Sequence, residues 1–196
     1  MDRQLSQLIL FWKLHKLHHS HLRPQSLSFL LAVCIAGLTL AAYWPVTEYG
    51  FINFDDPLYV ADNPIVQSGL NWNSFTWAFR ATHANNYHPV TWLSHMLDCQ
   101  LFGLSSSRHH LVNLLFHTIN ALLLFFFLCK TTKSLWKNAA VAALFALHPI
   151  HVESVAWISE RKDVVSLFFM LLTLLAYLRY TTAPSLCRYL LVLLLY

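Results

Sequence analysis

Charged side chains are scarce in this sequence. Asp, Glu, Lys and Arg make up 11% of its 196 residues, whereas hydrophobic residues make up 57%. A soluble domain carries roughly 25% charged residues, so the composition excludes an ordinary water-soluble fold and predicts an integral membrane protein. The basic residues behind the formal net charge of +4 lie beside apolar spans and are not massed on one element. A nucleic-acid partner is therefore not predicted.

Paired cysteine motifs are also missing. The four cysteines, Cys34, Cys99, Cys129 and Cys187, include no C-x-x-C pair, and three of them fall within or beside apolar segments. A free thiol acts there as a small hydrophobic group. We therefore predict neither disulfides nor a cysteine zinc site. No cofactor is predicted, and a divalent metal is kept as an open alternative.

Long apolar segments predict an all-α integral membrane fold with about four transmembrane helices. A bilayer needs about 20 apolar residues per helix, and four segments approach this length: residues 26–46, 109–129, 138–158 and 164–180. The first is read as a retained anchor, because it is too long for a signal-peptide core. Residues 181–196 form a loop and open a fifth apolar run. We therefore expect a truncated fifth helix and a longer parent protein.

Basic residues set the expected orientation. The positive-inside rule places two segments in the cytoplasm, the basic, His-rich tail of residues 1–25 and the lysine-bearing loop of residues 130–137. Apolar residues of the tail fit an amphipathic helix lying on the membrane. The N-terminus is therefore expected in the cytoplasm. The expected membrane is the bacterial inner membrane, with the endoplasmic reticulum as the alternative.

The loop of residues 47–108 then lies outside the cytoplasm, as does the short turn of residues 159–163. Within the loop, the aromatic residues of 72–79 are separated by polar residues, and the apolar residues of 90–102 recur at helical spacing. Both segments are too short and too polar to span. We predict interfacial amphipathic helices whose apolar faces rest on the membrane. A small folded ectodomain that packs the same aromatic side chains is the alternative.

Two neighbouring carboxylates, Asp55 and Asp56, follow the first span closely. Asp55 lies nine residues beyond Val46, which is at most about 30 Å of extended chain. Pro57 favours extended geometry for Asp56, and successive side chains of an extended segment point in opposite directions. One carboxylate is predicted to act as a catalytic base and the other to fix the loop or a ligand. The alternative is a solvated Asp-Pro turn.

A second group of polar residues falls on the same side of the predicted membrane. Its members, all predicted to bind substrate, are His88, His148, His151, Glu153, Glu160, Arg161, Lys162 and Asp163. Arg161 can bind a phosphate as a bidentate fork and Lys162 as a point charge, which suggests a lipid-phosphate substrate. The His148-x-x-His151-x-Glu153 pattern also allows a zinc site, although Pro149 interrupts the helix between the histidines.

Several blocks of the sequence resemble a known family. Phe54-Asp55-Asp56 resembles the acidic motif in the first external loop of GT-C glycosyltransferases. Residues 87–95, 109–113 and 148–163 resemble blocks of the transmembrane and tetratricopeptide-repeat-containing O-mannosyltransferase-like group. This resemblance extends from about residue 50 to residue 180.

The resemblance implies a polyprenyl- or dolichyl-phosphate sugar donor and an inverting transfer to an acceptor hydroxyl on a protein or glycan. The base would be Asp55 or Asp56, on the non-cytoplasmic face, with membrane lipid as a further partner. The repeat domain and the later helices of that group are absent from this sequence, so activity is expected of a full-length parent and not of the chain alone. The alternatives are a non-catalytic membrane anchor or interaction module, a truncated remnant, and a membrane metalloenzyme.

Overall fold

The computed structural model describes residues 24–196, and these residues form helices and loops without a β-strand. Three helical segments are long and apolar enough to cross a membrane, Gln25–Glu48, Ser106–Thr131 and Ile158–Thr182, and a bent pair makes a fourth, Leu135–Leu147 with Pro149–Ala156. The predicted all-α membrane fold is therefore confirmed. The tail predicted over residues 1–25 lies outside the described residues, except for its last two positions.

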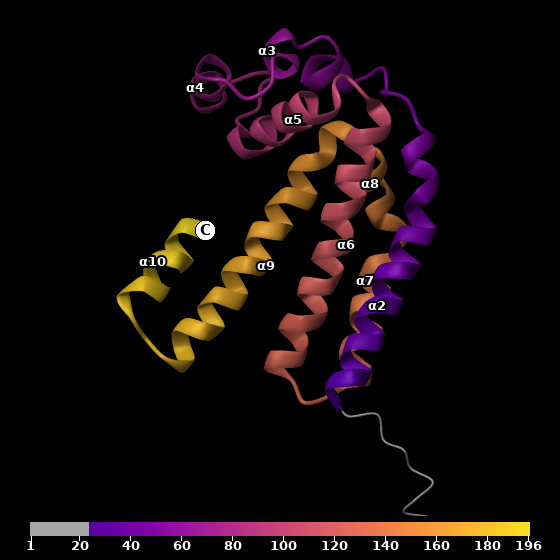
Figure 1. Ribbon diagram of the computed structural model, residues 1–196, viewed down its shortest axis with the longest axis vertical. Helices are drawn as coiled ribbons and strands as arrows, with labels where there is room; N and C mark the ends of the chain where they lie inside the picture. Colours follow the sequence, from indigo (N-terminus) through magenta and orange to yellow (C-terminus); the bar gives the residue numbers. More distant parts are fainter. Residues whose placement is uncertain (1–23) are drawn as a thin grey trace, which may run out of the picture.

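The long helices run side by side as a bundle (Figure 1). Its members are α2 (Pro24–Tyr43), α6 (Ser106–Thr131), α7 (Leu135–Leu147) and α9 (Arg161–Thr182), and the 3-10 turn η1 (Trp44–Glu48) prolongs α2. Buried alanines fill the contact between α2, α6 and α7, namely Ala32, Ala121, Ala139, Ala142 and Ala146. Small residues let helix backbones approach closely, and such packing drives helix association in lipid.

The span that begins with α7 breaks at His148. Pro149 has no backbone N–H and disfavours helical geometry in the residue before it, and His148 accordingly adopts φ −69° and ψ 130°. The chain resumes as the 3-10 turn η3 (Pro149–His151), the short helix α8 (Val152–Ala156) and the 3-10 turn η4 (Ile158–Glu160). The two halves are bent by 45°, so backbone groups at the break need partners from other elements.

A cap of short helices covers one end of the bundle (Figure 1). It consists of the single-turn π-helix η2 (Pro57–Ala61), α3 (Pro64–Gln67), α4 (Trp72–Arg80) and α5 (Pro89–Phe102). Asn63 and Asn71 start α3 and α4 by accepting hydrogen bonds from the first backbone N–H groups. Trp92 and Met96 of α5 are buried in the core of the cap, and Ile158 of η4 belongs to the same core. This core attaches the cap to the bundle.

The outer face of α4 is aromatic and uncovered. Trp72, Phe75 and Phe79 follow one another along the helix with ring centroids 6.0 and 5.1 Å apart, and Trp72 is 76% exposed. The loop therefore combines features of both predicted alternatives. It has a packed core of its own, and it keeps an apolar helical face of the kind that lies on a membrane.

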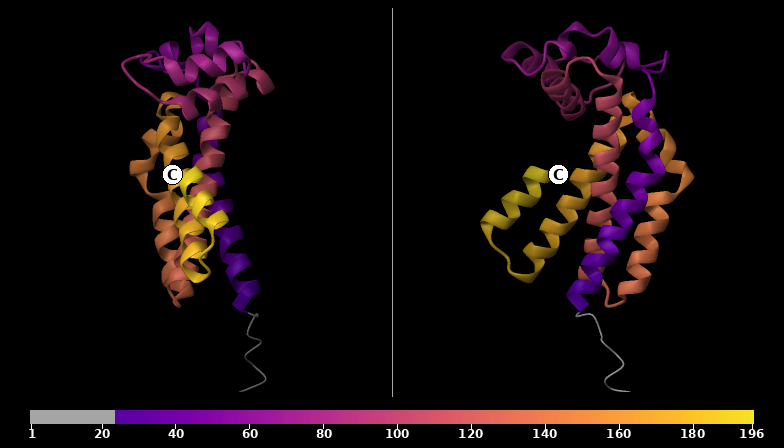
Figure 2. Two further views of the ribbon diagram at one scale, coloured as in Figure 1. Left: turned by 90° about the vertical axis from the view of Figure 1, so that its left-hand side faces the viewer. Right: turned by 45° about the vertical axis from the view of Figure 1, so that its right-hand side comes forward.

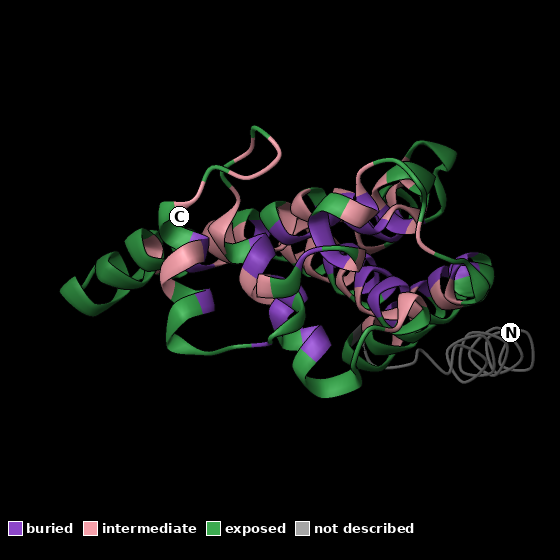
Figure 3. Cartoon of the chain, turned by 90° about the horizontal axis from the view of Figure 1, so that it is seen from above, coloured by how far each residue is buried: buried purple, intermediate pink, exposed green. Residues whose placement is uncertain are grey.

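The last helix, α10 (Leu186–Leu195), turns back against α9 (Figure 2). It falls in residues 181–196, where the sequence predicts a fifth helix, and none of its residues is buried. Figure 3 shows that buried residues gather between the helices, whereas outward faces are exposed. Because lipid tails are as apolar as leucine, exposed aliphatic residues suit the outside of a membrane bundle.

Candidate functional site

The acidic motif is locked to the bundle through Asp56, which is fully buried. Oδ1 of Asp56 accepts hydrogen bonds from the backbone N–H and the hydroxyl of Ser159, at 3.0 and 2.5 Å. Oδ2 accepts the backbone N–H of Ile52 at 2.8 Å. A buried carboxylate is tolerated when such donors replace water. The two bonds from Ser159 hold the loop against the turn that precedes α9, and the bond from Ile52 lies within the loop itself.

The predicted extended geometry of Asp56 is wrong. Its backbone is helical, with φ −59° and ψ −35°. The preference imposed by Pro57 is modest, and the three hydrogen bonds to the Asp56 carboxylate, all from fixed donors, outweigh it.

Asp55 has the opposite environment. Its side chain is half-buried, and within residues 24–196 its carboxylate accepts no hydrogen bond. Burial raises the pKa of the Tyr59 phenol, and the nearby carboxylates of Asp55 and Glu160 raise it further. Asp55 and Glu160 therefore share the surroundings of Tyr59. The structure separates the acidic pair into one carboxylate that fixes the loop and one that is free.

The turn of residues 159–163 alternates between the core and the surface. Ser159 and Arg161 are buried. Glu160 and Lys162 are half-buried and form an ion pair, with Nζ 2.5 Å from Oε1. The inward residues hold the turn in place, and the outward residues present one negative and one positive charge.

Arg161 is fully buried at the start of α9. Its guanidinium donates to Asn113 Oδ1 at 2.7 Å, to the backbone carbonyl of His109 at 2.8 Å, to the hydroxyl of Ser94 at 3.2 Å, and to Asp98 Oδ2 in an ion pair. We call these residues the Arg161 network, and they join α5, α6 and α9. The predicted binding of phosphate by Arg161 does not fit this burial, which leaves Lys162 as the accessible cation of the turn.

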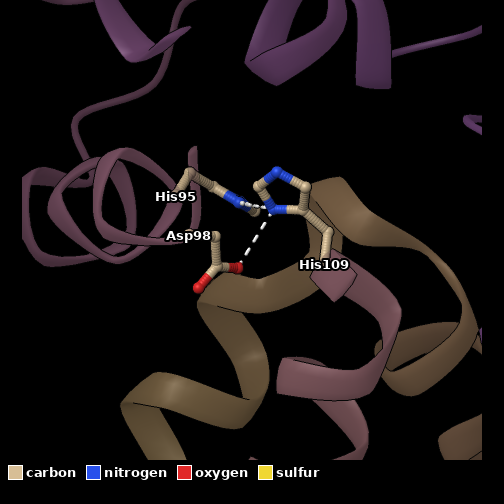
Figure 4. A group of neighbouring side chains, drawn as sticks. All are labelled: His95, Asp98 and His109. Atoms are coloured by element: carbon tan, nitrogen blue, oxygen red, sulfur yellow. Dashed lines mark hydrogen bonds and ion pairs between the residues drawn. The ribbon is translucent and has the colours of Figure 1, made fainter. Parts of the chain in front are cut away.

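Two histidines extend the network beyond Asp98 (Figure 4). Nδ1 of His109 lies 3.1 Å from Asp98 Oδ2 and 3.3 Å from Nδ1 of His95. Burial keeps the pKa of His95 well below its usual value, and the positive charge of Arg161 acts in the same direction. The one Nδ1–H of His109 is therefore shared between Asp98 Oδ2 and a neutral His95, which accepts at Nδ1 and carries its own proton on Nε2.

The ligand atoms of His95, Asp98 and His109 also lie within 4.8 Å of one another, close enough to share a metal ion. A divalent ion there would lie beside the guanidinium of Arg161, which already neutralises Asp98. The donor set therefore favours a hydrogen-bonded network over a metal centre.

His148, His151 and Glu153 lie along the broken span. His148 and Glu153 are exposed, and Nδ1 of His148 accepts the backbone N–H of Ile150 at 3.2 Å. The ring of His151 packs on Phe145, with centroids 4.5 Å apart. Within residues 24–196, the three predicted zinc ligands do not converge on one point, as a shared ion requires. The structure therefore gives no support to the zinc alternative.

A polar face of α6 supplies the break in this span with hydrogen-bonding groups. Nε2 of His117 lies 3.0 Å from the carbonyl of Ala146. The amide of Asn113 donates to the carbonyls of Trp157 at 3.2 Å and Val155 at 3.5 Å. Carbonyls left free by a helix break are costly in lipid unless such groups satisfy them. His117 thus satisfies a carbonyl beside the break, and Asn113 satisfies carbonyls at the end of α8.

A cleft of about 830 Å³ opens between the start of α5, α9 and the end of α10. Its polar lining includes His88, Lys162 and Asp163, and its apolar lining includes Val165, Phe169, Met170, Leu174, Leu194 and Leu195. Lys162 and Leu174 are separated by roughly 18 Å along α9, at 1.5 Å per residue, so the cleft is charged at the end beside Lys162, which we call its mouth, and mainly apolar towards the other end. Burial lowers the pKa of His88, and the positive charge of Lys162 lowers it further. The carboxylates of Glu160 and Asp163 act in the opposite direction.

Asp98, Ser94 and Asn113 were not identified from the sequence as members of the Arg161 network. One signal was available, because His95 and Asp98 are three residues apart and therefore share a face of the predicted helix. Their partner Arg161, however, is 63 residues from Asp98 in the chain, and helical spacing gives no information about a contact at that separation.

The fold and the site define a multi-pass, all-α membrane protein whose acidic loop is tied to the charged turn of residues 159–163 at one end of a helical bundle. The chain is 33% identical over 160 residues to protein O-mannosyl-transferase TMTC1 of Homo sapiens, which covers 76% of this chain and 18% of that protein. It is 31% identical over 153 residues to TMTC3 of Homo sapiens, covering 74% of this chain and 16% of that protein. It is 31% identical over 167 residues to Tmtc2 of Drosophila melanogaster, covering 81% and 18%.

These matches confirm the resemblance to the transmembrane and tetratricopeptide-repeat-containing O-mannosyltransferase group. The chain spans less than a fifth of the length of these relatives. No family model and no solved structure matches it.

Proposed function

We propose that this chain forms part of an O-mannosyltransferase that moves a sugar from a polyprenyl- or dolichyl-phosphate donor to an acceptor hydroxyl on the non-cytoplasmic face of a membrane. The observation that carries the proposal is the bond pattern of the acidic pair. Asp56 is bound by three donors, and Asp55 accepts none within the described chain. The curated relatives named as O-mannosyl-transferases support the reaction class.

Asp55 is the proposed base. A carboxylate with no protein donor keeps its lone pairs for the proton of an acceptor hydroxyl. As that oxygen bonds to the anomeric carbon, the carbon–oxygen bond to the phosphate breaks, and its electrons leave with the phosphate. Attack from the face opposite the leaving group inverts the anomeric centre. Asp56 acts by holding the loop that carries Asp55.

The cleft is the proposed donor site. Lys162 offers a positive charge at its mouth, where a phosphate would lie, and Glu160 keeps the Lys162 ammonium oriented through their ion pair. The apolar side chains of α9 and α10 suit an isoprenoid chain. His88 and Asp163 line the mouth, where sugar hydroxyls need hydrogen-bonding partners.

The proposed orientation puts the cap and the cleft mouth outside the cytoplasm and the N-terminus inside, following the distribution of basic residues. The bacterial inner membrane is the proposed location, with the endoplasmic reticulum as the alternative. The acceptor is proposed to be a protein or glycan hydroxyl.

A photoactivatable polyprenyl phosphate tests the donor site. The chain, reconstituted in lipid nanodiscs, should be labelled on α9 and α10, and Lys162→Met should reduce that labelling. Lys137→Met serves as the matched control, because it changes an exposed lysine on α7, a helix that does not line the cleft. Labelling spread evenly over α2, α7 and α9, and unaffected by Lys162→Met, would reject the donor site.

A further inference from the structure

The inference concerns the Arg161 network, which touches neither the acidic pair nor the cleft directly and has no role in the reaction described above. We propose that Asp98 is a positioning residue of the donor site. It anchors Arg161 in the core and so fixes Lys162 at the cleft mouth. This inference rests on the proposed function, because it assigns the position of the residue that would meet the phosphate.

The side chains of the turn point alternately into the protein and outward. Arg161 stands between Glu160 and Lys162, and its side chain points into the protein while theirs point out. The direction of the Arg161 side chain therefore determines which way Lys162 faces. If the guanidinium left the core, the two outward residues would turn with it.

The guanidinium of Arg161 connects three helices. It binds Ser94 and Asp98 on α5 and Asn113 on α6, although it belongs to α9. Of these partners only Asp98 carries a charge. Asp98 therefore provides the main attraction that keeps a buried cation at this point.

The first residues of α5 and α9 form the mouth of the cleft. His88 to Thr91 line it from the start of α5, and four residues line it from the start of α9, namely Lys162, Asp163, Val165 and Ser166. The contact between Asp98 and Arg161 ties these two helices beside the mouth. It thereby sets the separation between the helix starts.

His109 holds Asp98 in turn. Its Nδ1 lies 3.1 Å from Asp98 Oδ2, and its backbone carbonyl accepts from Arg161 at 2.8 Å. His109 thus contacts both members of the ion pair, one through its ring and the other through its backbone. Ring removal leaves the pair itself in place, which makes His109→Gln a milder perturbation than Asp98→Asn.

The test compares two ligands on the whole chain in nanodiscs, a short polyprenyl phosphate and the prenol of the same length. Asp98→Asn should weaken binding of the phosphate about tenfold, the loss expected of one charge-assisted contact, and should leave the prenol affinity unchanged. Lys162→Met should have the same selective effect. Because both changes act on one contact, the double variant should be no weaker than Lys162→Met alone.

A second measurement follows the mouth itself. Spin labels at Val90 and Ser166, which line the cleft from α5 and α9, should give a narrow distance distribution in the parent chain and a broader one in Asp98→Asn. If Asp98→Asn does not fold, His109→Gln and Ser94→Ala carry the same comparisons. Loss of affinity for both ligands would instead indicate a purely structural role.

The outcomes separate the two proposals. A wild-type chain that binds the phosphate no better than the prenol contradicts the donor site. A different result contradicts only the positioning role of Asp98. In that case the wild-type chain prefers the phosphate and Lys162→Met weakens this preference, but a folded Asp98→Asn variant leaves it unchanged. Additive effects of the two substitutions, or an unchanged label distance, also overturn the positioning role.

Discussion

Asp56 and Ser159 are 103 residues apart in the chain, and two hydrogen bonds join them. The carboxylate accepts both the hydroxyl and the backbone N–H of Ser159, so one oxygen of the acidic loop is fixed to the start of the turn that carries Glu160, Arg161 and Lys162. This contact brings the acidic motif and the charged turn into one site. It also occupies Oδ1 of Asp56, whereas Oδ2 accepts the backbone N–H of Ile52.

Ser159→Ala removes the shorter of these bonds and leaves Asp56 buried with two donors. We expect the free energy of unfolding to fall by about 1.5–3 kcal/mol, the range for a hydrogen bond to a charged group. Ser154→Ala is the matched control, because Ser154 donates to the exposed Asp163 and its loss should cost less than about 1 kcal/mol. Thermal unfolding in detergent measures both. Equal effects of the two substitutions would contradict the importance assigned to the Asp56 contact.

The membrane helices were predictable from the sequence because apolar length and composition determine them directly. The division of labour within Asp55 and Asp56 was predictable only in outline. Which of the two fixes the loop depends on Ser159, and the backbone geometry expected beside Pro57 was wrong. Local propensity cannot anticipate a hydrogen-bond donor that arrives from 103 residues away.

Arg161 shows the same limitation. A cation beside Lys162 in a turn looks like a second phosphate ligand, because nothing in the neighbouring sequence reveals that it is buried. Its partner Asp98 lies on α5, a segment selected at the sequence level only for its apolar periodicity. The break at Pro149, by contrast, follows from the proline itself, and His117 of α6 satisfies a carbonyl beside it.

Asn113 and Asn120 share a face of α6 but should differ in their contribution to stability. Asn113 satisfies Arg161 Nε and the carbonyls of Val155 and Trp157, whereas Asn120 donates once, to Val164. Asn113→Leu should therefore lower the free energy of unfolding by about 2–5 kcal/mol, because it leaves a buried charge and carbonyls unsatisfied.

Asn120→Leu serves as the comparison and should cost about 0.6 kcal/mol, the average for a hydrogen bond between membrane helices. Chemical denaturation in mixed micelles measures both variants. A cost for Asn120→Leu as large as that for Asn113→Leu would contradict the role given to the helix break.

The aromatic face of α4 should rest in the membrane interface. Spin labels replacing Phe75 and Phe79 should be more accessible to oxygen than to a water-soluble nickel complex, because oxygen concentrates in the apolar phase. A label at Asn73, also exposed on α4, should show the reverse. Power-saturation EPR in liposomes gives these accessibilities, on a background in which the exposed Cys34 and Cys187 are replaced by serine. Aqueous accessibility at all three positions would favour a cap that stands clear of the membrane.

Acidification should destabilise the fold partly through His95. The folded state keeps this buried histidine neutral, whereas an unfolded histidine has a pKa of about 6.5. The contribution of His95 to the free energy of unfolding is therefore fully present above about pH 6.5. Below it the unfolded state binds a proton that the folded state refuses, at a cost of about 1.4 kcal/mol per pH unit for this residue.

His95→Asn retains an acceptor near the position of Nδ1 and removes the titrating group. Its thermal midpoint should fall less steeply between pH 6.5 and 5 than that of the parent chain. His148→Asn changes an exposed histidine and should leave the slope as it is. Parallel slopes for His95→Asn and the parent chain would show that His95 is not held neutral.

The most direct measurement is in-membrane transfer of labelled sugar from polyprenyl phosphate by the intact protein that contains this chain, carrying Asp55→Asn or Asp56→Asn. Asp55→Asn should keep the thermal stability of the parent and lose about 10²–10⁴-fold in transfer, the contribution of a general base. Asp56→Asn should lower stability first and transfer as a consequence. Undiminished transfer by a folded Asp55→Asn protein would contradict the assignment of Asp55 as the base.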